Sequence, residues 1–369
     1  MGLNIYLGEC LMLDLMKEKT KERLDSNCKI PRISANLYCA DSVNLREIVQ
    51  KENVLGVIKF SEMEKHDDLD AFVGCFPTMN VAMKPFLGTA YYEVWTSENP
   101  VSYGCNEFLQ HASDGFHSFF TLSIKEEGRD LREIGRLAYD SIFETVKNND
   151  YSNISRIWNQ IPNINAYSGE KERYTKFCHG RAESFQKNEN IYPAATGIGC
   201  RGESLCIYLI STSRNINKYI ENPNQTPAYK YPPKYGIKSP SFARAAYADN
   251  GSGTGMLYIS GTASILGSET VHIGDVGKQC ETTIDNIGTL ISGTNLNSYG
   301  IEKSFTLENI DCIKVYIKND EDFETIRNIC SKAFSNNKSI VYLKADVCRN
   351  DLLVEIEGVI KDTALYQEE

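Results

Sequence analysis

Two glutamates stand two residues apart in an otherwise apolar stretch near the C-terminus, "LLVEIEGVI", residues 352–360. In a β-strand alternate side chains point to the same face, so Glu355 and Glu357 share one face and the apolar residues between them share the other. Two interpretations are open. Either the charged face lies in water, or one carboxyl lies in a pocket, where desolvation raises its pKa and makes it a usable proton donor.

Metal and cofactor chemistry have little support in the sequence. The twelve cysteines are scattered singly without a Cys-x-x-Cys pair, and the five histidines form no helical pair of the His-x-x-x-His kind. With no export signal in view, most cysteines are expected to be reduced core residues. No phosphate-binding loop, dinucleotide-binding glycine motif or nucleophile elbow occurs. The sequence therefore predicts no metal and no cofactor.

Composition indicates an ordinary globular protein of two or three domains. The chain has 369 residues, of which 41% are hydrophobic and 24% charged, and its formal net charge is -10. An acidic balance of this size argues against nucleic-acid binding. No apolar run reaches the roughly 18 residues that a membrane span needs, and the N-terminus lacks the basic region of a signal peptide. We therefore expect no membrane association and a cytoplasmic location.

Proline marks the clearest boundary in the chain. Residues 221–241, "ENPNQTPAYKYPPKYGIKSPS", exclude a regular helix and are expected to form a connecting segment. This divides the chain into an N-terminal α/β domain, 1–220, and a C-terminal domain, 242–369.

Alternating strands and helices are predicted in the C-terminal domain. Strands are expected at 255–265 and 312–319, amphipathic helices at 276–292 and 320–334, and two further strands after them. The economical architecture is α/β (α+β), with helices packed on one face of a mixed sheet. In the N-terminal domain, a strand before the amphipathic helix 130–148 gives the same order, which indicates a diverged copy of the unit.

Three stretches of sequence, taken in order, resemble one enzyme family. They are "RIWNQIPNINAYSGEKERY" from residue 156, "ENPNQTPAYKYPPKYGIKSPSFAR" from 221 and "SGTASILGSETVHIGDVGKQCETTIDNI" from 260. Together they resemble the chorismatases, which remove pyruvate from chorismate without a cofactor. The resemblance also implies that the C-terminal domain is similar to the YjgF-type fold of reactive-intermediate deaminases, with at least two such units in the chain.

The resemblance implies a set of site residues. In the family the strand matching "VEIEG" carries a catalytic glutamate, which falls on Glu355. A structural role is favoured for Glu357. Chorismate is a dianion, so arginines should line its pocket. The candidates for carboxylate binding are Arg173, Arg181, Arg201, Arg244 and Arg349, with Arg173 and Arg244 favoured.

Tyrosines and two small residues complete the expected site. Tyr229, Tyr231 and Tyr235 either line the pocket or pack the proline-rich segment on the core. Gly261 and Cys348 match the family positions that accompany a hydroxybenzoate product, where a thiolate could remove a ring proton. Read without the family, Cys348 is better interpreted as an inert buried thiol.

These expectations combine into one function and its alternatives. The predicted enzyme eliminates pyruvate from chorismate to give 3-hydroxybenzoate, as a monomer whose internal units replace the neighbouring subunits of a small trimeric relative. The alternatives are a chorismate hydrolase that gives a dihydroxycyclohexadiene carboxylate, a deaminase of enamines or imines, and a binding protein of the same fold without catalysis.

Overall fold

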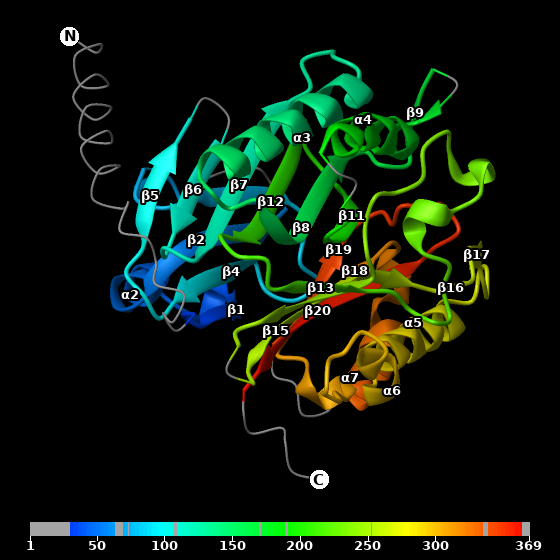
Figure 1. The fold of residues 1–369 in the computed structure, drawn as a ribbon. Helices are drawn as coiled ribbons and strands as arrows, with labels where there is room; N and C mark the ends of the chain where they lie inside the picture. Colours follow the sequence, from blue (N-terminus) through cyan, green and yellow to red (C-terminus); the bar gives the residue numbers. More distant parts are fainter. Residues whose placement is uncertain are drawn as a thin grey trace.

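A computed structural model describes residues 30–363, apart from 63–68, 73, 107–108, 170, 189–190, 252 and 335–338. The N-terminal residues for which the sequence predicts no signal peptide lie outside this described part. In the described part, three mixed β-sheets enclose a central core and the longer helices lie outside them (Figure 1). The predicted class, α/β with mixed sheets and more than one sheet-and-helix unit, is confirmed.

The N-terminal sheet has four strands in the order β1-β4-β2-β3. Its elements are β1 (Ile33–Cys39), α2 (Leu45–Lys51), β2 (Asn53–Ser61), β3 (Thr78–Ala82) and β4 (Ala90–Ser97). The α2 helix begins after Asn44, whose side chain accepts a hydrogen bond from the backbone N–H of Arg46.

The middle sheet has six strands in the order β11-β8-β12-β7-β6-β5. Its elements are β5 (Ser102–Cys105), β6 (Leu109–Ser113), β7 (His117–Lys125), α3 (Leu131–Asn148), β8 (Asn153–Pro162), the hairpin of β9 (Tyr167–Ser168) and β10 (Lys171–Glu172), α4 (Arg173–Lys187), β11 (Ala194–Cys200) and β12 (Ser204–Thr212). The predicted helix at 130–148 is confirmed as α3. It begins after the capping residue Asp130 and buries the predicted stripe that includes Leu131, Ile134 and Ile142.

The C-terminal sheet also has six strands, in the order β13-β14-β15-β20-β18-β19. Its elements are β13 (Asn217–Ile220), β14 (Ala245–Asp249), β15 (Gly255–Ala263), the hairpin of β16 (Ile265–Leu266) and β17 (Glu269–Thr270), α5 (Val276–Ile291), α6 (Gly293–Asn297), β18 (Cys312–Ile317), α7 (Phe323–Ala333), β19 (Ile340–Lys344) and β20 (Val354–Asp362). Short 3-10 helices lie at Ala40–Ser42, Asp70–Phe72, Ala228–Lys230, Pro233–Tyr235, Leu307–Asn309 and Asp320–Asp322. The predicted strands and helices in this part of the chain are confirmed as β15, α5, β18, α7, β19 and β20, while β14, the β16–β17 hairpin and α6 were not predicted.

The middle and C-terminal sheets are built on the same plan. The order strand, helix, strand, helix, strand, strand occurs as β7-α3-β8-α4-β11-β12 and again as β15-α5-β18-α7-β19-β20. In each copy the two strands joined by the second helix pair in parallel, β8 with β11 and β18 with β19, and the last strand inserts between the first two. The N-terminal part thus contains the diverged copy that the sequence indicated.

The sheets group the chain differently from the predicted division at residue 220. Strand β13 precedes the proline-rich segment but pairs antiparallel with β14, so it belongs to the C-terminal sheet. The described residues before β13 form two separate sheets besides the hairpin of β9 and β10. The proline-rich segment therefore connects two neighbouring strands of one sheet.

Aromatic side chains from all three sheets meet in the central core. Trp95, Trp158, Tyr208 and Tyr258 are buried there, and the rings of Trp158 and Tyr208 stack with centroids 4.5 Å apart. Fully burying each such side chain stabilises the fold by roughly 1.5–3 kcal/mol, so the sheets are held firmly against one another. Side chains at the sheet edges are thereby held in fixed relative positions.

Candidate active site

A cavity of about 1210 Å³ lies where the middle and C-terminal sheets meet. One wall comes from the first turns of α4 and from β11, and the opposite wall from β15, β20 and the loop before β20. The proline-rich segment covers one side. Among the sequence-predicted residues, the cavity is lined by Glu355, Cys348, Gly261, Arg244, Arg349, Tyr231 and Tyr235.

Glu355 is the acidic residue at the inner wall of this cavity. It lies on β20 opposite Ala263 of β15 and Tyr316 of β18, and only 4% of it is exposed. Burial raises the pKa of its carboxyl to about 8, and the negative charge of Glu357 adds to the shift, while Arg156 and Arg244 oppose it. At neutral pH the side chain is therefore an uncharged acid that faces a cavity.

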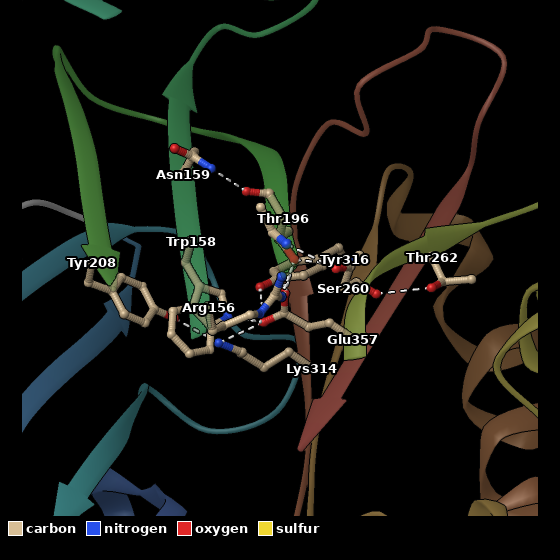
Figure 2. A network of polar contacts seen from close by, with 12 residues as sticks. Arg156, Trp158, Asn159, Thr196, Tyr208, Ser260, Thr262, Lys314, Tyr316 and Glu357 are labelled. Atoms are coloured by element: carbon tan, nitrogen blue, oxygen red, sulfur yellow. Dashed lines mark hydrogen bonds and ion pairs between the residues drawn. The ribbon is translucent and has the colours of Figure 1, made fainter. Parts of the chain in front are cut away.

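Glu357 lies two residues further along the same face of β20, but its surroundings favour the charged form of the carboxyl. Its carboxylate forms ion pairs with Lys314 of β18 and Arg156 of β8, each at 2.7 Å (Figure 2). Burial alone would raise the pKa of Glu357, but these cations and its hydrogen bonds outweigh burial and hold the pKa below its ordinary value. Two carboxyls on one strand thus differ in protonation because their surroundings differ.

Gly261 leaves room for the Glu355 side chain. The pairing of β15 with β20 shifts register between Ile259 and Thr262, so Gly261 lies in a bulge of the sheet. A Cβ at this position would overlap the carboxyl of Glu355 and come within 3.1 Å of the Thr196 methyl group. Only glycine is compatible with the observed position of the acid.

Cys348 lies in the loop before β20 and is partly exposed to the cavity. Burial, with a smaller contribution from the neighbouring Glu355, raises the pKa of its thiol to about 12, while Arg349 and Arg244 oppose the shift. The resting side chain is therefore a neutral thiol. A thiolate base, as the family resemblance suggested, is not the form present before reaction.

Two arginines line the cavity without a carboxylate partner among the described residues. Arg244 donates to the hydroxyl of Tyr231 (2.6 Å) and to the backbone carbonyl of Thr226. The Arg349 guanidinium stacks 3.8 Å from the ring centroid of Tyr235 and donates to the carbonyl of Ser268. Within the described chain, Nε of Arg244 and Nη2 of Arg349 are buried without a hydrogen-bond partner. Within the described residues these two guanidinium groups have no ion-pair partner, so the cavity offers positive charge to an anionic ligand.

Four residues predicted to bind the substrate are placed outside the cavity lining, so the structure does not support that role for them. Arg173 pairs with Glu126 and donates to the carbonyl of Pro162. Arg181 is buried against Tyr139 and Phe185 and holds the carbonyl of Ser241. Arg201 is exposed near Glu62, and Tyr229 stacks on Tyr192. Each has a partner within the protein that directs it elsewhere.

Several site residues were missed by the sequence reasoning. Tyr174 and Phe242 line the cavity, and Arg156, Thr196 and Lys314 contact Glu357. Lys314 could have been predicted, because it is a charged residue in the middle of the apolar strand "CIKVYI", and a buried lysine needs an acidic partner. Arg156 likewise interrupts the apolar run of β8.

Further features of the described residues bear on cofactors and membranes. No group of three or more His, Cys, Asp or Glu side chains in the described part of the chain is arranged to hold a metal ion. Among the same residues, no helix combines the length and apolar character required to span a membrane.

Comparisons with known proteins agree with the geometry. The family model described as chorismatase FkbO/Hyg5-like, N-terminal, matches residues 93–211. A curated 3-hydroxybenzoate synthase of Streptomyces hygroscopicus is 41% identical to this chain, and the match covers 84% of this chain and 92% of that protein. A chorismatase of Streptomyces rapamycinicus is 33% identical, with 88% and 97% covered. A chorismatase crystal structure superposes with a TM-score of 0.82 at 30% identity and covers 90% of this chain and 100% of its own.

Proposed function

The chain belongs to the chorismatase family, and from this premise we propose that it converts chorismate to 3-hydroxybenzoate and pyruvate. The observation that carries the proposal is Glu355, an uncharged buried acid in a cavity that also contains two arginines for which the described residues provide no carboxylate partner. The 41% identity to a 3-hydroxybenzoate synthase and the presence of both Gly261 and Cys348 support this product over a dihydroxy acid.

Glu355 starts the reaction as a general acid. It donates its proton to the methylene carbon of the enolpyruvyl group, and the resulting oxocarbenium ion weakens the bond between the ether oxygen and the ring. The oxygen of the neighbouring ring hydroxyl gives up its proton and attacks the carbon that carries the ether, so that an epoxide forms and pyruvate leaves with the ether oxygen as its ketone. The epoxide then opens by breaking the bond between its oxygen and the carbon that first carried the hydroxyl. Loss of a ring proton aromatises the product. The atoms of chorismate divide completely between the two products, so no water, oxidant or reductant is consumed.

The ionised Glu355 carboxylate can receive the proton released later in the reaction. After donating, it is a buried anion with a raised pKa, which makes it a stronger base than an ordinary carboxylate. This balances the proton that it gave up. Because the Cys348 thiol is neutral at rest, its role is to shape the cavity beside the acid.

Arg244 and Arg349 are the groups that hold the two substrate carboxylates. Each is planar, permanently charged and free of a carboxylate partner within the described chain, which suits bidentate binding of a carboxylate. Tyr231 and Tyr235 fix their orientation, the first through a hydrogen bond and the second by stacking. The dianion is thus held by cations while the vinylic carbon faces the acid.

Product identification tests the proposal. Purified protein incubated with chorismate should release equal amounts of pyruvate and 3-hydroxybenzoate, resolved by chromatography and mass. Pyruvate with only the dihydroxycyclohexadiene acid would assign the chain to the hydrolase alternative. No pyruvate from correctly folded protein would contradict enzymatic activity on chorismate.

We also expect the enzyme to act as a monomer in the cytoplasm. Three sheets of one chain share a central hydrophobic cluster, so the units that would pair between subunits of a smaller protein are supplied internally. Sedimentation at micromolar concentration should give a mass near the 41.5 kDa of the chain. A trimeric mass would contradict this expectation.

A further inference from the structure

Glu357 makes no contact with the cavity, yet it is surrounded by donors from several elements. Only 2% of it is exposed. Its carboxylate accepts hydrogen bonds from the indole N–H of Trp158 (3.0 Å), the hydroxyl of Tyr316 (3.0 Å) and the hydroxyl of Thr196 (Figure 2). With Lys314 and Arg156, these groups hold it from β8, β11 and β18. Such a fully satisfied buried group has one orientation.

The charges in this network balance. Lys314 lies opposite Glu357 in the sheet and forms a second ion pair with Glu93 of β4, also at 2.7 Å. Two carboxylates, Glu93 and Glu357, thus face two cations, Lys314 and Arg156. Removing the charge of Glu357 would leave a net positive charge beside Glu355, in a region of low dielectric constant.

Thr196 connects this network to the catalytic acid. Its hydroxyl donates to Glu357 and accepts from Arg156 and from the backbone N–H of Gly261, the last at 2.9 Å. That N–H belongs to the bulge of β15 and needs a partner outside the sheet. Gly261 in turn contacts the carboxyl of Glu355. A chain of direct contacts therefore runs from Glu357 through Thr196 and Gly261 to Glu355.

We propose, resting on the function above, that Glu357 is a positioning residue with two effects on Glu355: its fixed negative charge keeps the proton on that carboxyl, and its bond to Thr196 holds the Gly261 backbone against it. A set of packed apolar residues in place of the whole network, its cations included, is often no worse for stability than the buried ion pairs themselves. The network is therefore explained by what it does for Glu355.

Other charged and titratable groups also face Glu355, and the effect of Glu357 must be separated from theirs. They come from β8 (Arg156), from the residue before β14 (Arg244), from the loop before β20 (Cys348 and Arg349) and from β18 (Tyr316). Arg156 and Arg244 lower the pKa of Glu355, and Glu357 is the neighbouring charge that raises it. Substitutions of opposite charge should therefore shift the pH profile in opposite directions.

The pH dependence of kcat/KM for chorismate separates charge from geometry. In the unaltered protein, activity should be lost as the pH rises through about 8, because Glu355 must carry its proton. Glu357→Gln should move this loss to lower pH by about one unit or more, while the low-pH plateau stays within roughly tenfold of the original. Arg156→Met should move the loss to higher pH.

Thr196→Val isolates the geometric effect. It removes the hydroxyl that binds Gly261 without changing any charge, so the plateau of kcat should fall by about tenfold or more and the pH of half-maximal activity should stay in place. Circular dichroism and thermal unfolding establish that each variant is folded. Because Thr196→Val is uncharged and nearly isosteric, it tests the contact chain even if Glu357→Gln does not fold.

The outcomes distinguish this inference from the proposed function. If the unaltered protein releases no pyruvate, the function itself is contradicted. If the unaltered protein is active but Glu357→Gln and Arg156→Met leave the pH profile unmoved, or shift it the same way, the electrostatic role of Glu357 is contradicted and the function stands. An unchanged kcat in Thr196→Val would contradict the geometric role.

Discussion

The middle and C-terminal units share one topology but differ at the strand that closes each sheet. In the middle unit that strand is β12, "SLCIYLIST", which pairs with β7 in continuous register. In the C-terminal unit it is β20, "VEIEGVIKD", which pairs with β15 across a bulge. The residues of β12 that face the central core are Cys206, Tyr208 and Ile210, without an acid among them. The two units therefore share a topology, but only the C-terminal unit has the acidic residues on its closing strand and the bulge that accommodates one of them.

Removing the acid from β20 should have the largest effect on activity. Glu355→Gln keeps the shape of the side chain but cannot protonate carbon, so kcat should fall by about 10²–10⁴-fold. Steady-state release of pyruvate measures the loss, and an unchanged unfolding midpoint shows that the fold is retained. Residual activity near that of the unaltered protein would mean that another group is the proton donor.

Filling the bulge should have the next largest effect. Gly261→Ala places a methyl group where the Glu355 carboxyl lies, and a displacement of about 1 Å can reduce turnover by about a hundredfold. Gly288→Ala is the matched control, because nothing lies within 4 Å of a Cβ at that position of α5. The control should retain full activity and gain up to about 1 kcal/mol in stability. Equal activity of the two variants would contradict the role of the bulge in positioning the Glu355 carboxyl.

The cations of the cavity should matter mainly for binding. Arg244→Met removes a guanidinium that lacks a carboxylate partner among the described residues, and KM for chorismate should rise by about tenfold to a hundredfold. Arg201→Met is the control, because Arg201 is exposed and lies outside the cavity lining. Kinetics at a pH well below 8 avoid interference from the titration of Glu355. A larger rise in KM in the control would place the substrate elsewhere.

The smallest effect is expected on stability. Glu355→Leu makes β20 resemble β12 by replacing a desolvated acid with an apolar side chain, which should stabilise the inactive protein by about 1 kcal/mol. Chemical denaturation below pH 8 measures the change. A decrease of several kcal/mol in the free energy of unfolding would show that the Glu355 carboxyl stabilises the fold. It would contradict the interpretation that burying this acid destabilises the protein.

Much of the fold could be read from local sequence patterns. The helices α3, α5 and α7 and the strands β15, β18, β19 and β20 follow directly from their apolar periodicity. The assignment of β13 could not be obtained in this way. Its pairing with β14 bridges the proline-rich segment, and a long-range strand pairing leaves no local signal.

Some of the residues that line the cavity could be predicted from the sequence, but most of the arginines could not be assigned. Glu355 and Cys348 lie seven residues apart, on β20 and in the loop before it, so their proximity followed from the chain itself, whereas Gly261 lies on the neighbouring strand β15 and was expected beside them only from the family resemblance. The sequence position of an arginine does not indicate what it binds, because a guanidinium at the end of a long side chain can reach any nearby acceptor. Arg173 lies at the start of α4, beside the cavity wall, yet it turns to Glu126.

The protonation state of Glu355 tests the central claim most directly. Infrared difference spectra between the unaltered protein and Glu355→Gln, recorded across a pH series, isolate the signal of this one carboxyl. The structure predicts a protonated carboxyl at pH 7 that ionises near pH 8, while Glu357 stays ionised. A carboxylate at position 355 at pH 7, which takes up a proton only near the ordinary value for glutamate of about 4.3, would contradict the account.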